Sequence, residues 1–241
     1  MKSWTTKSGQ RIIQVLGGRS NCFLISYRCQ HLLVDAGRKN RWHSLRIRLD
    51  RLGLHADSLR ALILTHNHFD HAENAAAIQE KFKTKIIIHK GEADYLASGD
   101  NPLVHGTTFV TRFLTDLFAK RLLARWKYKP VEYDILIDER YDLNHWGFNA
   151  YLLHTPGHSP GSISVIVDHE IAIVGDAMFG IIKGSVLPPF AEDSKLMVKS
   201  WAKLLDTGCS IFLPGHGSQR SRELLRKQSD KYTFDNRKKS Q

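Results

Sequence analysis

The sequence predicts an α/β protein, an αβ/βα sandwich in which two mixed β-sheets pack together and helices flank them. Short apolar segments with the pattern of strands occur in both halves of the chain, and a helix or two closes each half. With 241 residues, 42% of them hydrophobic and 24% charged, the chain has the composition of a globular domain. No low-complexity linker interrupts it, so we expect a single domain over residues 10–229.

The N-terminal half begins with short strands separated by turn residues such as Gly17-Gly18, an order typical of a meander. In the helix that follows, Trp42, Leu45 and Leu49 fall on one face. The apolar run Ala61–Leu64 does not alternate, so we expect its strand to be covered on both faces. The expected elements are strands at 11–16, 22–26 and 31–35, a helix at 41–54, a strand at 59–65, a helix at 72–83, a strand at 85–89 and a short helix at 91–97.

The C-terminal half repeats the order of strands followed by helices. Its expected elements are strands at 135–138, 149–154, 162–167 and 171–174, a helix at 194–205, a strand at 211–213 and a helix at 218–228. The last residues, 230–241, are polar and basic, and we expect this tail to be disordered.

The segment at about 100–130 does not fit a minimal domain. Its apolar residues recur with helical spacing and are flanked by basic residues, which predicts a helical excursion. Three interpretations stay open for it: an excursion that packs on the core, a lid over the active site, and a helix lying on a membrane surface. The apolar residues are Phe109, Phe113, Leu114, Leu117, Phe118, Leu122 and Trp126.

Charge and cysteine content limit the partners and the environment. The formal net charge of +11 suits nucleic acid, anionic membranes or acidic substrates, but the basic residues are spread along the chain and we interpret them as a solvated surface. Three cysteines without CxxC spacing indicate reduced thiols. The polar residues 1–10 lack the apolar core of a secretory signal, and no apolar run approaches the roughly 18 residues of a membrane span. We expect a cytoplasmic protein, and the sequence indicates no particular oligomeric state.

The segment His66–His71 reads HNHFDH and places four potential metal ligands directly after an apolar strand. His66 and His68 are two residues apart, so in extended backbone their side chains point the same way. Asp70 and His71 then enter the start of a helix and turn toward a second point. Any one of the 13 histidines would mean little alone, but three imidazoles and a carboxylate within six residues serve no packing purpose. The segment therefore predicts a metal site.

Three later side chains have the same chemistry and a similar setting. Each lies on a Gly- or Pro-rich loop that follows an apolar strand, and such loops are where sites usually form. They are His158 in TPGHSPG, Asp176 in VGDAMF and His216 in LPGHG.

Taken in order, HNHFDH, TPGHSPGS, VGDAMF and LPGHG resemble the motifs of the metallo-β-lactamase superfamily, and Val34–Gly37 resembles its early strand motif. The resemblance extends from about Ile12 to His216, and the full set of motifs is specific. It implies the metallo-β-lactamase fold and a site for two metals. One metal would be bound by His66, His68 and His158, the second by Asp70, His71 and His216, and Asp176 would bridge them.

Imidazole and carboxylate ligands suit two divalent ions, zinc first and also iron or manganese. Two ions about 3.5–4 Å apart would lower the pKa of bound water to about 7, so a bridging hydroxide is the expected nucleophile. Resembling enzymes suggest that Asp70 is also catalytic, orienting the nucleophile or passing on its proton. Asp35 and Thr65 are candidates to support the ligands, with buried turn residues as the equal alternative.

The motifs fix the type of reaction better than the substrate. True β-lactamases of this fold generally lack the bridging aspartate, so Asp176 favours the wider group of thioesterases, lactonases and phosphoesterases. Enzymes of the glyoxalase II type carry a C-terminal helical domain, whereas only about 25 residues follow His216 here. Lactonases that quench quorum signals often have a tyrosine where this chain has Phe179.

Aromatic residues on the ligand loops and in the excursion could wall an apolar pocket, although each alone could equally be part of the core. We therefore expect a small-molecule substrate with an acyl or aromatic portion and an ester, thioester or lactone bond. The candidate substrate-binding residues are Phe69, Phe113, Trp126, Phe179 and Phe190.

Two other kinds of function stay open. Iron-dependent members of the superfamily oxidise persulfides or, with a flavin, reduce oxygen. The flavin-linked group usually has glutamate at the position of His68, and the persulfide group tends to lack the PGHG loop. A phosphodiesterase, a nuclease of the RNase Z type or a nucleic-acid-binding protein would suit the charge, yet the extra arm or domain of those nucleases has no evident counterpart.

Overall fold

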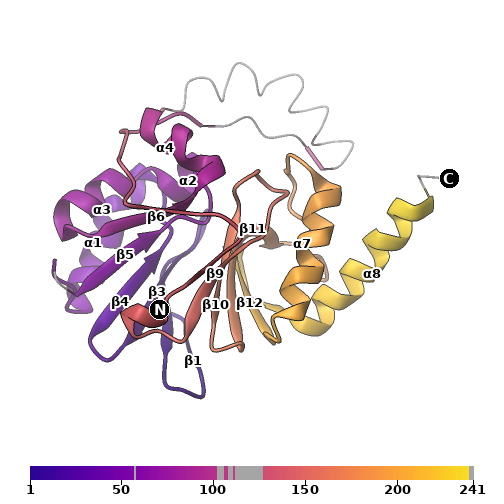
Figure 1. Cartoon of the computed structure of the whole chain (residues 1–241), viewed down its shortest axis with the longest axis horizontal. Helices are drawn as coiled ribbons and strands as arrows, with labels where there is room; N and C mark the ends of the chain where they lie inside the picture. Colours follow the sequence, from indigo (N-terminus) through magenta and orange to yellow (C-terminus); the bar gives the residue numbers. More distant parts are fainter. Residues whose placement is uncertain (57, 102–105, 108–110, 112–126, 239–241) are drawn as a thin grey trace.

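The structure, a computed structural model, describes residues 1–56, 58–101, 106–107, 111 and 127–238. Within them two mixed β-sheets pack face to face and helices cover both outer faces, which confirms the predicted sandwich (Figure 1). No helix in these residues is both long and apolar enough to span a bilayer.

The first sheet has seven strands in sequence order. The first four form an antiparallel meander and the last three continue it in parallel. Parallel neighbours need a crossover connection, and helices supply it here. The strands are β1 (Ser3–Thr5), β2 (Arg11–Leu16), β3 (Cys22–Tyr27), β4 (Gln30–Val34), β5 (Leu59–Ile63), β6 (Lys85–His89) and β7 (Ile135–Ile137); the helices between them are η1 (Lys39–Arg41), α1 (Trp42–Arg51), α2 (Phe69–Ala72), α3 (Ala75–Phe82), η2 (Lys90–Glu92) and α4 (Ala93–Ser98).

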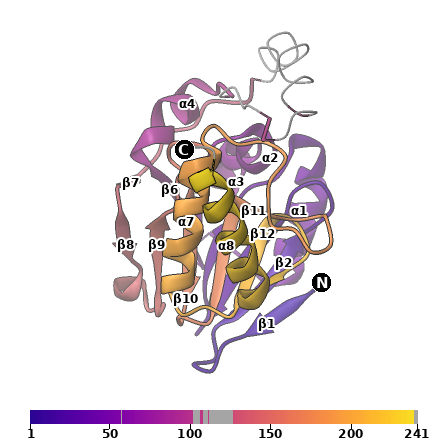
Figure 2. The ribbon, with the colours of Figure 1, turned by 90° about the vertical axis from the view of Figure 1, so that its right-hand side faces the viewer.

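The second sheet has six strands in the order β13-β12-β11-β10-β9-β8, and only β11 and β12 pair in parallel. Helix α7 makes the crossover between these two, and α7 and α8 lie on the outer face of this sheet (Figure 2). The elements are β8 (Arg140–Asp142), η5 (Asn144–Trp146), β9 (Ala150–His154), β10 (Ile163–Val167), β11 (Ile171–Gly180), α7 (Ser194–Asp206), β12 (Ile211–Gly217), β13 (Arg220–Ser221) and α8 (Arg222–Lys238).

The apolar side chains form three layers because successive residues of a strand point to opposite faces. In β5, Ala61 and Ile63 pack between the two sheets, whereas Leu62 packs under the helices of the first sheet. Both faces of this strand are buried, which explains its continuous apolar run. A third layer, around Trp201, joins the second sheet to α7 and α8.

The structure corrects the expected boundaries at several places. The helix expected at 72–83 is two helices, α2 and α3, with Asn74 between them holding the carbonyl oxygens of residues 36–38. The folded unit includes β1, which precedes residue 10. The helix expected at 218–228 is α8, which runs from Arg222 to Lys238, and the ring of Tyr232 packs against Trp201 in α7.

Candidate metal centre

Seven side chains from four separate segments of the sequence meet in one place. They come from the loop after β5, from α2, from the loop between β9 and β10, and from β11 and β12. Their potential ligand atoms form three groups, each with all its atoms within 4.8 Å of one another. The groups are His66, His68 and His158; His66, His71 and Asp176; and Asp70, His71 and His216.

Asp176 and His216 lie within strands, whereas the sequence had suggested that they lie on loops after strands. Strands β11 and β12 continue to Gly180 and Gly217, and their pairing shifts register on either side of Gly175. A Cβ atom on Gly215 would overlap Oδ1 of Asp176, so only glycine leaves room for the carboxylate there. The Gly-rich sequence around both residues is therefore part of the site.

The group of three histidines, which we call the histidine cluster, is fully neutral. Nε2 of His158 lies 2.9 Å from Nδ1 of His68, while Nδ1 of His158 donates to the carbonyl of Phe190 at 2.9 Å. Burial lowers the pKa of His158, and burial with the adjacent imidazoles lowers the pKa of His66 well below its ordinary value. Burial, together with the adjacent His158 imidazole, lowers the pKa of His68 to about 3. Neutral imidazoles have free lone pairs, which a cation requires.

The group formed by Asp70, His71 and His216, which we call the mixed cluster, is charged. Nε2 of His216 lies 3.3 Å from Nε2 of His71 and 3.3 Å from Oδ2 of Asp70. Burial disfavours protonation of His71, but the carboxylates of Asp176, Asp35 and Asp70 raise its pKa well above the ordinary value. Burial also opposes protonation of His216, but Asp176 and Asp70 raise its pKa to about 9.

Asp176 lies between the two clusters. Its Oδ2 is 3.6 Å from Nε2 of His158 and 3.3 Å from Nε2 of His216, and its Oδ1 is 3.4 Å from Nε2 of His71. Burial alone would raise the pKa of Asp176, yet the charges of His216 and His71 hold it well below its usual range. One carboxylate can therefore serve both clusters.

The donor set fits divalent cations. Nε2 of His66, Nε2 of His68 and Oδ1 of Asp176 are buried and have no hydrogen-bond partner among the described residues. Buried polar atoms are normally paired, because leaving one unpaired costs about 1–3 kcal/mol. Nitrogen and carboxylate oxygen atoms that converge without partners are the coordination that zinc, iron or manganese takes.

Asp35 and Thr65 support the cluster from behind. Asp35 accepts from the backbone N–H of Thr65 at 2.8 Å, and its Oδ2 lies 2.8 Å from Nδ1 of His71. The hydroxyl of Thr65 lies 3.0 Å from Nδ1 of His66. These contacts fix the orientation of two imidazoles and leave Nε2 of each directed at the site.

Glu92 is a further supporting residue, which the sequence did not reveal. It is buried, and its carboxylate accepts from the backbone N–H of Asn67 at 3.2 Å and of Gly161 at 2.9 Å. Burial raises the pKa of Glu92. The residue thus ties the loop of His66 and His68 to the loop of His158. A single Glu in a short helix carries no sequence signal of this role.

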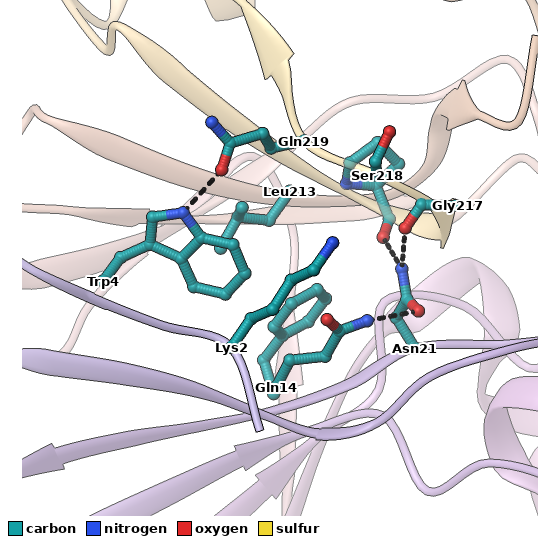
Figure 3. A pocket seen from close by; sticks show the side chains of 10 residues that line it. Lys2, Trp4, Gln14, Asn21, Leu213, Gly217, Ser218 and Gln219 are labelled. Atoms are coloured by element: carbon teal, nitrogen blue, oxygen red, sulfur yellow. Dashed lines mark hydrogen bonds between the residues drawn. The ribbon is translucent and has the colours of Figure 1, made fainter.

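Asn21 holds the loop of His216 in a comparable way. Its Nδ2 donates to the carbonyls of Pro214 and Gly217 at 2.8 and 3.0 Å, and its backbone N–H donates to Gly215 at 2.7 Å. Gln14 donates to Oδ1 of Asn21 at 2.7 Å and so fixes the orientation of the amide (Figure 3). Three carbonyls around one candidate ligand are therefore held by one buried residue.

The candidate aromatic residues have different surroundings. Phe179 stacks on His216 with ring centroids 4.5 Å apart, and Phe190 reaches the site through its backbone carbonyl. Phe69 packs against the core beneath the helices, with the guanidinium of Arg38 above its ring. Phe113, Trp126 and most of the excursion lie outside the described residues.

Residues at the two ends of the excursion contact the ligand loops. The hydroxyl of Tyr128 donates to the carbonyl of Asn67 at 3.0 Å, and Thr107 donates to the carbonyls of Pro188 and Pro189. Both contacts are made next to loops that carry candidate ligands.

Comparison with known proteins agrees with the geometry. The sequence pattern described as metallo-beta-lactamase superfamily matches residues 15–216. A probable metallo-hydrolase of Methanocaldococcus jannaschii is 31% identical over 68% of this chain and 69% of its own. The hydroxyacylglutathione hydrolase GloC of Haemophilus influenzae is 30% identical over 86% of this chain and 90% of its own.

Solved structures show the same fold at low sequence identity. An archaeal metallo-beta-lactamase superfamily protein of Sulfolobus tokodaii has a TM-score of 0.64 and 21% identity, covering 91% of this chain and 85% of its own. The B3 metallo-beta-lactamase BLEG-1 has a TM-score of 0.68 and 22% identity, covering 90% and 97%. From its motifs, its fold and its relatives, we conclude that the chain belongs to the metallo-β-lactamase superfamily.

Proposed function

We propose that this protein is a hydrolase that holds two divalent metal ions, with zinc as the first candidate, and cleaves an ester, thioester or lactone bond. The observation that carries the proposal is the convergence of seven nitrogen and oxygen ligands on two adjoining clusters that share the carboxylate of Asp176. Metal-dependent hydrolysis at the level of the family is also what the names of the relatives describe.

The residues would divide into two coordination sets. The histidine cluster would hold one ion, the mixed cluster the other, and Asp176 would belong to both. When bound, such ions supply hydroxide at neutral pH and polarise the oxygen of the substrate's carbonyl group. The remaining chemistry belongs to the chain: Asp35 sets the orientation of His71, and Glu92 and Asn21 set the positions of the loops.

Asp70 is our candidate for proton transfer. Its side chain is 17% exposed, against 5% for Asp176, so it lies toward the side from which substrate and water would enter. Burial would raise the pKa of Asp70, but His71 and His216 lower it to about 2. An ionised carboxylate at this position can accept a hydrogen bond from the attacking water and pass on its proton.

A thioester is the substrate class that a relative supports. The sequence argument against the glyoxalase II type was the short segment after His216. GloC removes that argument, because the match covers 90% of its length and leaves no room in it for a large additional domain. Phe179, which stacks on His216, and Phe190 would line the approach of the acyl group.

The test is an activity screen of protein stripped of metal and reloaded with zinc, iron or manganese. The substrates are a hydroxyacylglutathione, a lactone, a simple ester, a phosphodiester and a β-lactam. We expect the reloaded protein to hydrolyse the hydroxyacylglutathione, the lactone or the simple ester. This activity should be lost in Asp176→Ala. The exposed residue His43 provides the matched control, His43→Ala. Equal rates for the wild type and Asp176→Ala, or failure of the wild type to bind divalent metals, would contradict the proposal.

Thiol oxidation and salt-dependent binding of short RNA or DNA are measured on the same samples. Oxygen consumption by the iron-loaded protein would favour the oxidoreductase alternative. Nucleic-acid binding with a steep salt dependence would favour a nuclease or a nucleic-acid-binding protein.

A further inference from the structure

An open cavity of about 140 Å³ lies between the turn after β2 and the segment that leads into α1. Three arginines dominate its lining, and we call it the three-arginine pocket. The polar lining residues are Arg19, Ser20, Arg38, Asn40 and Arg41, with the backbone of Gly17. The cavity is large enough for a carboxylate or a phosphate group and its first bonded atoms.

The three guanidinium groups have no acidic partner among the described residues. None of them takes part in an ion pair there, and Nε of Arg38 is buried without a hydrogen-bond acceptor. Glu73, the acidic residue at this segment, accepts instead from the backbone N–H of Lys39. Arg19 and Arg41 are exposed, so their guanidinium groups are free to form charge-assisted hydrogen bonds with an anion in the pocket.

Other arginines of the protein show the contrast. Arg48 donates to the carbonyl of Val15, and Arg140 pairs with Asp142 at 2.9 Å. Arg220 donates to several backbone carbonyls. The partnered arginines are scattered over the protein, whereas three without partners converge on one cavity. Other exposed arginines such as Arg51 also lack an acidic partner among the described residues, so the convergence on one cavity is what distinguishes these three.

Two residues that line the pocket, Arg38 and Ser20, are linked to the mixed cluster through residues next to its members. The guanidinium carbon of Arg38 lies 5.0 Å from the centroid of the Phe69 ring, and Phe69 directly precedes Asp70. On the other side, Ser20 directly precedes Asn21, which holds the loop of His216. Asp70 and His216 are also the most exposed members of the mixed cluster.

We propose that the three-arginine pocket binds an anionic group, a carboxylate or a phosphate, carried by the part of the substrate remote from the cleaved bond. The proposal rests on the proposed function, since it names the part of the substrate that this pocket selects. Guanidinium groups match carboxylate and phosphate oxygens with paired hydrogen bonds. The substrate class is therefore a thioester or ester with an acidic leaving portion.

The test compares three thioesters with the same acyl group. The leaving thiols are N-acetylcysteamine, which is neutral, glutathione, which carries carboxylates, and coenzyme A, which carries phosphates. We expect the ratio of kcat/KM for an anionic substrate to kcat/KM for the neutral one to fall about tenfold in Arg41→Gln, mainly through KM. The glutathione and coenzyme A arms show which anion the pocket selects.

Arg51→Gln is the matched control, because Arg51 is an exposed arginine at the end of α1 that does not line the pocket. It removes the same charge and should leave the ratio unchanged. Arg38→Gln is a second pocket variant. Arg41→Gln should disturb folding less than Arg38→Gln, because Arg41 lies at the surface. A ratio that changes equally in Arg41→Gln and Arg51→Gln would overturn the proposal.

A binding measurement separates this proposal from the proposed function. If the wild type cleaves none of the thioesters, esters and lactones, the proposed function fails, yet calorimetry with free glutathione still tests the pocket. Binding that weakens about tenfold in Arg41→Gln but not in Arg51→Gln would support an anion site. Glutathione binding that is unchanged in Arg41→Gln would overturn the proposal. So would binding of a short RNA by the wild type that disappears in Arg41→Gln.

Discussion

The histidine cluster and the mixed cluster adjoin each other but differ in chemistry. The first consists of neutral, deeply buried imidazoles whose pKa values are lowered by burial. The second combines imidazoles with the carboxylate of Asp70, and its histidines have raised pKa values. The histidine cluster can receive a cation without losing protons, whereas the mixed cluster must release protons when a cation binds.

Exposure follows the same division. The side chain of His158 is 3% exposed, while those of His216 and Asp70 are 11% and 17% exposed. Asp70 and His216 therefore make the mixed cluster more accessible to solvent than His158 makes the histidine cluster. If both clusters hold a cation, as we propose, the histidine cluster holds it away from solvent and the mixed cluster holds it next to incoming substrate and water.

The largest expected effect comes from removing one histidine of each cluster. His158→Ala and His216→Ala should each lose about one of two bound ions. We expect activity to fall by more than the roughly 10- to 100-fold that is typical of residues hydrogen-bonded to a ligand. Metal analysis by mass spectrometry, with kcat measured on the best thioester, checks both. Loss of both ions from either variant would show that the clusters are not separate sites.

A smaller effect should follow from Asp35→Asn, because Asp35 contacts His71 of the mixed cluster directly and reaches His66 of the histidine cluster only through Thr65. Asp35 has a φ of 64°, a left-handed conformation that asparagine accepts, so the backbone is expected to persist. An amide that donates to Nδ1 of His71 would leave the proton on Nε2, the atom that faces the site. We expect metal affinity at the mixed cluster to fall about 10- to 100-fold.

Titration with a chelator measures that affinity, and the occupancy of the histidine cluster is the internal control. An equal loss of affinity at both clusters would contradict the assignment of Asp35 to one of them.

The smallest effect is on the stability of metal-free protein, where the clusters should respond to pH with opposite sign. His216, with its pKa raised to about 9, stabilises the fold below about pH 6.5, and this contribution is lost as the pH rises through 9. His68, with its pKa lowered to about 3, stays neutral in the fold. Its contribution is lost as the pH falls from about 6.5 toward 3, where the unfolded chain binds the proton.

We therefore expect the melting temperature of chelated protein to be highest near pH 6.5 and to fall by a few degrees on either side. Calorimetry of His216→Gln should show a shallower decline at alkaline pH, and His68→Gln a shallower decline at acidic pH. The same shape of curve in both variants would show that the clusters do not titrate as described.

Much of the architecture could be predicted because the strands have a strong periodic signal. The apolar run Ala61–Leu64 predicted burial on both faces, and both faces are buried. The short strands β1, β8 and β13 were missed, because two or three residues carry no periodicity. The extension of α8 was missed because its support, the contact of Tyr232 with Trp201, is not local in the sequence.

The candidate site shows the same limit. Motif spacing was enough to name the seven candidate ligands and to suggest Asp35 and Thr65 as supports, because these residues stand in dense or Gly-rich segments. Asn21 and Glu92 could not be found in this way. Each is a single polar residue whose role depends on which loops it meets, and those loops are 193 and 69 positions away.

The layered fold and the chemical types of the candidate ligands can be predicted from the sequence, since both depend on periodicity and on residues close together in the chain. How the candidate ligands divide into a neutral and a charged cluster depends on the folded structure. Burial and the distances between distant carboxylates and imidazoles set their protonation, and both arise only when the two sheets pack. The same packing brought three arginines of two separate turns to one cavity.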